Sequence, residues 1–313
     1  MYVLAPPFLA PGIKNRTYAL FKNTLESRIT TYLEHPSIMT TSTLAFIGGG
    51  NMAASLISGL VNDGYDPQHI LVSDPDAEKV ASLAAHFRIK PSSNNNQAVA
   101  DADIVILAVK PQVMEDVART LSSTIQQTKP LIISIAAGIR EADLQNWLGG
   151  EIALIRTMPN TPAMIQTGAI VLHASSQVST KQRDLAESIM RAVGLTRWVE
   201  HEELMDAVTA LSGSGPAYFF LVMEAMEAAG IELGIPADTA RLLTLQTALG
   251  AAKMAMESSD GPAILRQRVT SPGGTTESAL QTLNEGNLLP LFKQALTNAR
   301  DRSVELSRIL GKT

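Results

Sequence analysis

The first two hundred residues alternate between short apolar runs and segments with helical spacing. Residues 43–48 form an apolar run ending in glycine, and the next segment places Met52, Leu56 and Leu60 on one helical face. Several runs are rich in β-branched residues, which is typical of strands covered on both faces. We predict strands over 43–48, 70–73, 104–109, 131–135, 152–156, 169–172 and 196–199, and helices over 51–61, 76–87 and 180–193. This alternation predicts an α/β domain with a mostly parallel, doubly wound sheet of the Rossmann type.

After about residue 200 the pattern becomes entirely helical. Helical spacing covers residues 204–211, 217–233, 236–257, 262–268, 273–284 and 288–310. The segment 239–256 is rich in Ala, Leu and Met, and a helix that apolar is covered on most sides. In an all-α domain of this size we expect a second subunit to provide the cover. The alternative is a self-contained bundle core.

Composition narrows the class of protein. The chain has 313 residues, enough for two domains, with 45% hydrophobic and 18% charged residues. A net charge of -5 and only 4% aromatic residues argue against nucleic-acid binding. The absence of cysteine excludes disulfides, thiolate metal sites and a Cys nucleophile, and it fits a cytoplasmic location. The histidines show no metal-ligand spacing, and no apolar stretch approaches the ~20 residues of a membrane span.

Residues 1–41 lack these patterns, and we predict an N-terminal extension that is disordered. An apolar, proline-rich run precedes most of its basic residues, whereas a signal peptide carries positive charge before its apolar run. Two alternatives remain for this segment. It is a transit peptide, or it is sequence that lies upstream of a start at Met39.

A glycine-rich turn joins the first predicted strand to the first helix. Gly48-Gly49-Gly50-Asn51-Met52-Ala53 matches G-x-G-x-x-A in the strand–turn–helix context that dinucleotide binding requires. The first glycine permits a tight turn, the third glycine lets a pyrophosphate approach, and the helix N–H groups face the phosphates. We therefore assign residues 42–200 to a dinucleotide-binding domain. We assign residues 201–313 to a helical domain for dimerisation and, on account of the second glycine-rich segment described next, for substrate binding. A glycine loop without a ligand is the alternative.

The choice of cofactor stays open between NADPH and NADH. Asp74 follows the second strand, where an acid would bond a ribose 2′-hydroxyl, repel a 2′-phosphate and so favour NADH. The neighbours of Asp74 leave this choice open, because Ser73 precedes it, Pro75 follows it, and Lys79 lies in the next helix. Lys110, between Val109 and Pro111 at the next strand end, could meet the cofactor, although a solvated lysine is more common there. Residues 94–96 are interpreted as a polar loop with a structural role.

A second glycine-rich segment precedes the predicted helix over residues 277–284. Residues 271–276, Ser-Pro-Gly-Gly-Thr-Thr, combine side-chain-free N–H groups with two hydroxyls at a helix start, which is typical of an anion site. An ordinary Ser or Thr N-cap is the alternative, and it explains one hydroxyl but not the glycines.

Six segments, taken in order, closely resemble pyrroline-5-carboxylate reductases over roughly residues 42–310. They are FIGGGNMA at 46–53, AVKPQ at 108–112, SIAAG at 134–138, RTMPNTP at 156–162, LSGSGPAY at 211–218 and VTSPGGTTE at 269–277. The resemblance implies hydride transfer from NADPH or NADH to the C=N bond of 1-pyrroline-5-carboxylate, which yields L-proline. It also implies a homodimer formed by the helical domain, often assembled further into a decamer of five dimers.

The resemblance assigns functional residues to both domains. With the adjoining residues of the same turns, the cofactor set is Gly48, Gly49, Gly50, Asn51, Met52, Ser73, Asp74, Pro75, Asn95, Val109, Lys110, Pro111, Ala137, Asn160 and Thr161. The substrate set is Ser271, Gly273, Gly274, Thr275, Thr276 and, on the substrate side, Glu202.

The chemistry requires orientation of the substrate and placement of charge, because the cofactor itself carries the hydride. We expect the Thr276 hydroxyl to bond the ring nitrogen, either relaying a proton from water or orienting a substrate that arrives protonated. One rival is a dehydrogenase of hydroxy or keto acids, with Lys253 as acid or base. Another is a nucleotide-sensing oligomer without turnover.

Overall fold

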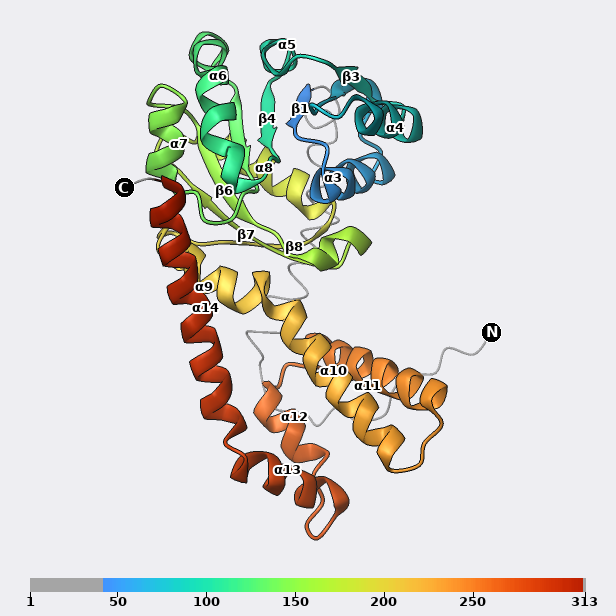
Figure 1. Ribbon diagram of the computed structural model, residues 1–313. Coiled ribbons are helices and arrows are strands. Elements are labelled where there is room, and N and C mark those ends of the chain that lie inside the picture. Colours follow the sequence, from blue (N-terminus) through green and yellow to red (C-terminus); the bar gives the residue numbers. More distant parts are fainter. Residues whose placement is uncertain (1–41, 312–313) are drawn as a thin grey trace, which may run out of the picture. The chain divides into compact units, whose positions relative to one another are not determined.

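The computed structural model describes residues 42–311, which divide into two compact units. The smaller unit spans residues 223–286, and the larger comprises residues 42–222 and 287–311. The extension predicted over residues 1–41 lies outside the described residues. The larger unit is a sheet with helices on both faces, as the sequence predicted (Figure 1).

The sheet of the larger unit has the order β3-β2-β1-β4-β5-β6-β7-β8. The first six strands run parallel, β7 is antiparallel to β6, and β8 is parallel to β7. The strands are β1 (Leu44–Ile47), β2 (Ile70–Ser73), β3 (Lys90–Ser92), β4 (Ile104–Leu107), β5 (Leu131–Ser134), β6 (Leu154–Met158), β7 (Gly168–Ala174) and β8 (Gly194–Trp198). The chain reverses its direction of winding between β1 and β4, which is the topological switch point of a Rossmann fold.

The central strands are buried on both faces. On β1, Leu44 and Phe46 pack into a core with α3 and α8, whereas Ala45 and Ile47 pack into a second core with α6 and α7. Burying a Leu, Ile or Phe side chain contributes about 1.5–3 kcal/mol. The helices of these layers are α3 (Asn51–Asn62), α4 (Ala77–Phe87), α5 (Asn95–Ala100), α6 (Met114–Thr128), α7 (Glu141–Trp147) and α8 (Thr180–Arg191), with short turns η1 (Pro67–His69), η2 (Pro111–Val113) and η3 (Thr161–Ile165).

The interpretation of residues 94–96 as a loop was wrong. Helix α5 begins at Asn95, and the Asn94 side chain caps it by accepting hydrogen bonds from the N–H groups of Asn96 and Gln97. An asparagine at the N-cap satisfies amides that the first helical turn leaves unpaired. The helix is only six residues long, and Ala98 and Val99 are its only buried residues. Its sequence therefore shows a run of polar residues rather than a helical apolar pattern.

The helical part begins in the larger unit and continues into the smaller one. Its elements are α9 (Leu204–Val208), the π-helical turn η4 (Thr209–Gly213), α10 (Gly215–Glu232), α11 (Ala237–Glu257), α12 (Pro262–Arg268), α13 (Thr275–Glu285) and α14 (Leu288–Gly311). As predicted, residues 204–311 contain no strand. Helix α14 belongs to the larger unit, where it packs against α9 and η4, and the Ser303 hydroxyl donates to Asp206 at 2.6 Å.

Helix α11 is mostly exposed within the chain. Only Ala240 and Thr244 are buried, whereas Leu242 is 68% and Leu249 is 62% exposed. An exposed apolar surface of this kind marks an interaction site, so the exposure argues against the self-contained bundle. None of the helices between residues 42 and 311 combines the length and apolarity that a membrane crossing requires.

The end of α14 packs against a buried carboxyl group. A Cβ atom at Gly311 would lie 2.5 Å from Asp143 Oδ2, so any larger residue would require the Asp143 side chain to move. Among the described residues, Asp143 Oδ2 has no hydrogen-bond partner. Burial raises the pKa of Asp143, although the Arg140 amide and guanidinium oppose the shift.

We predict that Asp143→Asn stabilises the protein increasingly as the pH rises above the ordinary aspartate range. A carboxyl group whose pKa is raised in the folded state binds its proton more tightly there, so stability falls as pH rises from the unfolded value near 3.8 through the folded value. Removing a poorly satisfied buried charge is worth about 1 kcal/mol. The melting temperature should therefore rise by roughly 2–4 °C at pH 8.

The same comparison at about pH 3.5, where the wild-type carboxyl is protonated, should show almost no difference. An equal shift in melting temperature at both pH values would mean that shape, not charge, is responsible.

Candidate dinucleotide and substrate sites

The glycine turn after β1 has the geometry of a phosphate cradle. Gly48 has φ +103, and a Cβ there would lie 2.6 Å from the Ala108 carbonyl oxygen, so no other residue fits. Gly50 caps α3 without any side-chain hydrogen bond, and a Cβ on Gly50 would meet nothing within 4 Å. The first-turn amides of α3 therefore have no side-chain cap, and they lie at the positive end of the helix dipole. This arrangement fits the pyrophosphate of a dinucleotide.

The predicted cofactor residues lie along one edge of the sheet. Strands β1 to β6 are parallel, so their carboxyl ends meet at that edge, which is where open α/β sheets bind ligands. Two neighbouring ends are joined directly, since the Ser73 hydroxyl donates to Asn95 Oδ1 at 2.6 Å. The edge carries Ser73, Asp74 and Pro75 after β2, Asn95 after β3, Val109, Lys110 and Pro111 after β4, Ala137 after β5, and Asn160 and Thr161 after β6.

Asp74 faces the glycine turn. Its Oδ2 accepts the Gly49 N–H at 2.8 Å, while Oδ1 accepts the Asp76 N–H at 3.0 Å and the Lys79 ammonium at 3.1 Å. Burial acts to raise the pKa of Asp74, but these three donors outweigh it and hold the pKa below its usual value. Asp74 is therefore a fixed negative charge beside the cradle.

Asn160 and Lys110 occupy the edge in different ways. The Asn160 amide is bonded at both ends, donating to the Ser212 carbonyl at 3.0 Å and accepting the Ala169 N–H at 2.9 Å. It thereby ties η3 to β7 and to the π-helical turn. Lys110 is exposed and forms no ion pair with any residue between 42 and 311.

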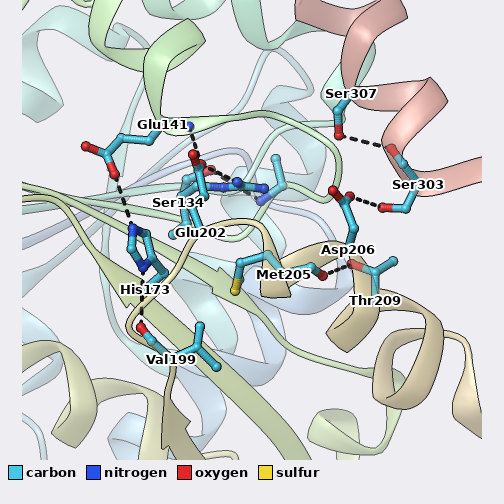
Figure 2. A network of polar contacts seen from close by, with 12 residues as sticks. Ser134, Glu141, His173, Val199, Glu202, Met205, Asp206, Thr209, Ser303 and Ser307 are labelled. Atoms are coloured by element: carbon cyan, nitrogen blue, oxygen red, sulfur yellow. Dashed lines mark hydrogen bonds and ion pairs between the residues drawn. The ribbon is translucent and has the colours of Figure 1, made fainter. Parts of the chain in front are cut away.

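Glu202 lies in a network of charges that the sequence did not reveal. Arg156 on β6 and the Glu141 amide on α7 both donate to Glu202 Oε1, the amide at 2.6 Å. The Glu141 carboxylate lies 3.3 Å from His173 Nε2, and His173 Nδ1 lies 3.3 Å from the Val199 carbonyl (Figure 2). Burial and the neighbouring Glu202 carboxylate raise the pKa of Glu141.

The sequence offered little warning of this network. His173 is one of the histidines without metal-ligand spacing, and Arg156 enters the sequence analysis only as the first residue of the motif at 156–162. They become neighbours because β6 and β7 pair antiparallel with Arg156 opposite His173. The network spans α7, β6, β7 and the segment before α9, and it places Glu202 within the larger unit.

The Ser-Pro-Gly-Gly-Thr-Thr segment forms a turn that opens α13 in the smaller unit. Gly273 has φ +71, and its N–H donates to Glu277 Oε2 at 2.7 Å. The Gly274 N–H donates to the Ser271 carbonyl at 3.0 Å, and Gly274 caps α13 without a side-chain bond. Within the described part of the chain, the hydroxyls of Ser271, Thr275 and Thr276 have no hydrogen-bond partner. The start of α13 thus offers hydroxyls and first-turn amides to an anion.

Comparison with known proteins matches both parts of the chain. Residues 202–306 match the family described as pyrroline-5-carboxylate reductase dimerisation, and residues 43–138 match NADP oxidoreductase coenzyme F420-dependent. Pyrroline-5-carboxylate reductase of Pseudomonas aeruginosa is 51% identical over 274 residues, covering 88% of this chain and 100% of the relative. Pyrroline-5-carboxylate reductase 1 of Bacillus subtilis is 38% identical, covering 86% of this chain and 91% of the relative.

Solved structures agree with these relatives. A pyrroline-5-carboxylate reductase from Coxiella burnetii is 47% identical with a TM-score of 0.82, covering 85% of this chain and 98% of the other. A pyrroline carboxylate reductase from Plasmodium falciparum, solved with NADP bound, is 26% identical with a TM-score of 0.77, covering 86% of this chain and 99% of the other.

The open space at Gly50 generates a test of the cradle. Gly50→Ala should keep its melting temperature within ~1 °C, because φ -72 and ψ 179 suit any residue and the new Cβ meets no atom. Its affinity for NAD(P)H, measured by calorimetry, should fall by roughly tenfold or more because the Cβ intrudes where the pyrophosphate approaches.

Gly48→Ala provides the contrast, since its Cβ would collide with the Ala108 backbone and lower the melting temperature. Unchanged NAD(P)H affinity in Gly50→Ala would show that the nucleotide does not lie against this turn.

Proposed function

The chain belongs to the pyrroline-5-carboxylate reductase family, and we propose that it reduces the C=N bond of 1-pyrroline-5-carboxylate with NAD(P)H to give L-proline. The observation that carries the proposal is the uncapped start of α3 at the switch point of the sheet, beneath Gly48 and Gly50. The bound nicotinamide supplies the hydride. The protein's residues hold the two reactants in place and control the protons.

The dinucleotide occupies the domain of residues 42–200, along the carboxyl edge of the sheet. The amides at the start of α3 bind the pyrophosphate, and Ser73, Asp74 and Pro75 lie near the adenosine ribose. Asn160 and Thr161, at the end of β6, lie on the nicotinamide side. Since the Asn160 amide is bonded at both ends, it supports the shape of this end of the site, and the exposed Thr161 is free to contact the nucleotide.

The imino acid is bound by the domain of residues 201–313, at the start of α13. Its carboxylate accepts hydrogen bonds from the amides of Thr275 and Thr276 and from the Thr275 hydroxyl, with Ser271 beside them, and the glycines leave the anion room to approach. The Thr276 hydroxyl also bonds the ring nitrogen. A threonine hydroxyl is a weak acid, so it orients a protonated imine or relays a proton from water.

Glu202 acts through the charge network. Arg156 and the Glu141 amide already occupy its Oε1, which makes Glu202 a residue that positions α7 and the entry to α9. The rival role for Lys253 has less support, because its ammonium pairs with the Glu257 carboxylate, one turn further along α11, at 3.9 Å. An acid or base for a carbinol would need to lie within hydrogen-bond reach of the proton that it transfers.

Subunits assemble through the helical domain. The match to a dimerisation family supports oligomer formation, and the exposed leucines of α10 and α11 supply the apolar surface. We propose that these helices build a homodimer and that five such dimers form a decamer. We also propose a cytoplasmic location, where reduced nicotinamide nucleotides are available to the enzyme.

Replacement of Thr276 tests the role of the hydroxyl. Loss of NADH and of NADPH is followed with pyrroline-5-carboxylate, and Thr276→Ala should lower kcat at least tenfold, because a hydrogen bond to a charged group is worth about 1.5–3 kcal/mol. Thr276→Ser should retain most of the rate. Thr282→Ala is the matched control, since the Thr282 hydroxyl donates only to the Ser278 carbonyl of its own helix.

Wild-type kinetics in Thr276→Ala would remove the hydroxyl from the reaction. Nucleotide binding without oxidation in the wild-type protein would favour the nucleotide-sensing oligomer.

The dimer generates a further prediction. Leu249 lies on the apolar surface of α11 and is 62% exposed in the single chain, so Leu249→Glu places a charge on that surface. The mass measured by light scattering should fall to that of a smaller assembly, because burying an unpaired carboxylate in an interface is strongly unfavourable. Lys181→Gln on α8, which lies in the larger unit, should leave the mass unchanged, and an unchanged mass in Leu249→Glu would place the interface elsewhere.

A further inference from the structure

Asp74 lies where a Rossmann fold reads the adenosine ribose. In this fold the side chain after the second strand meets the ribose hydroxyls. Here the carboxylate is held against the glycine turn by the Gly49 N–H at 2.8 Å, and its side chain is only 11% exposed. It therefore cannot swing away to admit a larger or more negative group without losing its bond to the turn. The inference that follows rests on the dinucleotide site proposed above.

The charges around Asp74 sum to a negative value. The Lys79 ammonium lies 3.1 Å from Asp74 Oδ1 and 3.8 Å from Asp76 Oδ2, so one cation faces two carboxylates. The neighbouring strand β3 adds no charge at this end, because it finishes at Ser92 and is followed by Ser93 and Asn94. The Ser73 hydroxyl is already donated to Asn95.

We propose that Asp74 makes this chain an NADH-preferring reductase, by accepting a hydrogen bond from the ribose 2′-hydroxyl and repelling a 2′-phosphate. A phosphate monoester carries close to two negative charges at neutral pH. Lys79 could attract the 2′-phosphate only by giving up its ion pairs with Asp74 and Asp76. Both carboxylates would then face the phosphate. A 2′-hydroxyl instead donates to a carboxylate whose lone pairs are not all used.

The choice is tested by binding, independently of turnover. The protein is titrated by calorimetry with NADH and NADPH, and with 5′-AMP and 2′,5′-ADP, which differ only in the 2′-phosphate. The wild type should bind NADH at least tenfold more tightly than NADPH, and 5′-AMP more tightly than 2′,5′-ADP. The ratio of kcat/KM for the two reduced nucleotides should follow the same order.

Asp74→Asn removes the charge while keeping an oxygen that can accept the Gly49 N–H. It should bind NADPH roughly tenfold more tightly and NADH several-fold more weakly than the wild type. Glu78→Gln is the matched control, because it removes an equal charge from an exposed side chain in the first turn of α4, outside the cluster of Asp74, Lys79 and Asp76. Its ratio of affinities should change by less than threefold.

Asp74→Ser is the second variant, used if Asp74→Asn fails to fold, and it should shift the ratio in the same direction. Tighter NADPH than NADH binding in the wild type, or an unchanged ratio in a folded Asp74 variant, would overturn the inference while leaving the reductase intact. Failure of the wild type to bind any of the four nucleotides would instead overturn the dinucleotide site, and the inference with it.

Discussion

The close approach of β1 to β4 at Gly48 is the constraint on which the dinucleotide site depends. The Gly48 N–H donates to the Ser73 carbonyl at 2.7 Å, and the Ala108 N–H donates to the Ile47 carbonyl at 2.8 Å, so the turn is tied to strands on both sides. Only a residue without a Cβ can stand there. The turn then directs α3 so that its first amides are left for a ligand, and Asp74 fixes the turn from the side through Gly49. The cradle is thus set by backbone geometry before any cofactor arrives.

Much of the fold could be predicted because burial on both faces leaves a clear sequence pattern. Strands β1, β2, β4 and β5 are fully buried, so they are continuous apolar runs, and the carboxyl edge follows from their parallel order. The edge strand β3 could not be recognised, because its three residues, Lys90 to Ser92, are at most half-buried. The short helix α5 was missed for a related reason, since a capping asparagine and two buried residues give no periodicity.

The candidate site divides in the same way. The glycine turn and the start of α13 were predictable, because bare amides require glycine and the sequence displays it. The charge network was not predictable, because Glu141 and Glu202 are 61 residues apart and meet only through the antiparallel pairing of β6 with β7. Spacing rules describe neighbours on one helix or strand, and they are silent on pairs formed by a change of strand direction. The proposed cofactor preference likewise rests on the partners of Asp74, which the sequence does not display.

The location of the proposed substrate loop has a thermodynamic consequence. Residues 271–276 belong to the unit of residues 223–286, which also carries α11 with its exposed leucines. A unit of about this size buries only roughly 60% of the surface that its unfolded chain exposes, so its stability alone is marginal. A partner that covers α11 stabilises the ordered unit by mass action, and with it the turn that opens α13. In the proposed dimer, subunit assembly and binding at the proposed substrate turn are therefore coupled through the stability of one small unit, whereas the proposed dinucleotide cradle is held by the sheet of the larger unit.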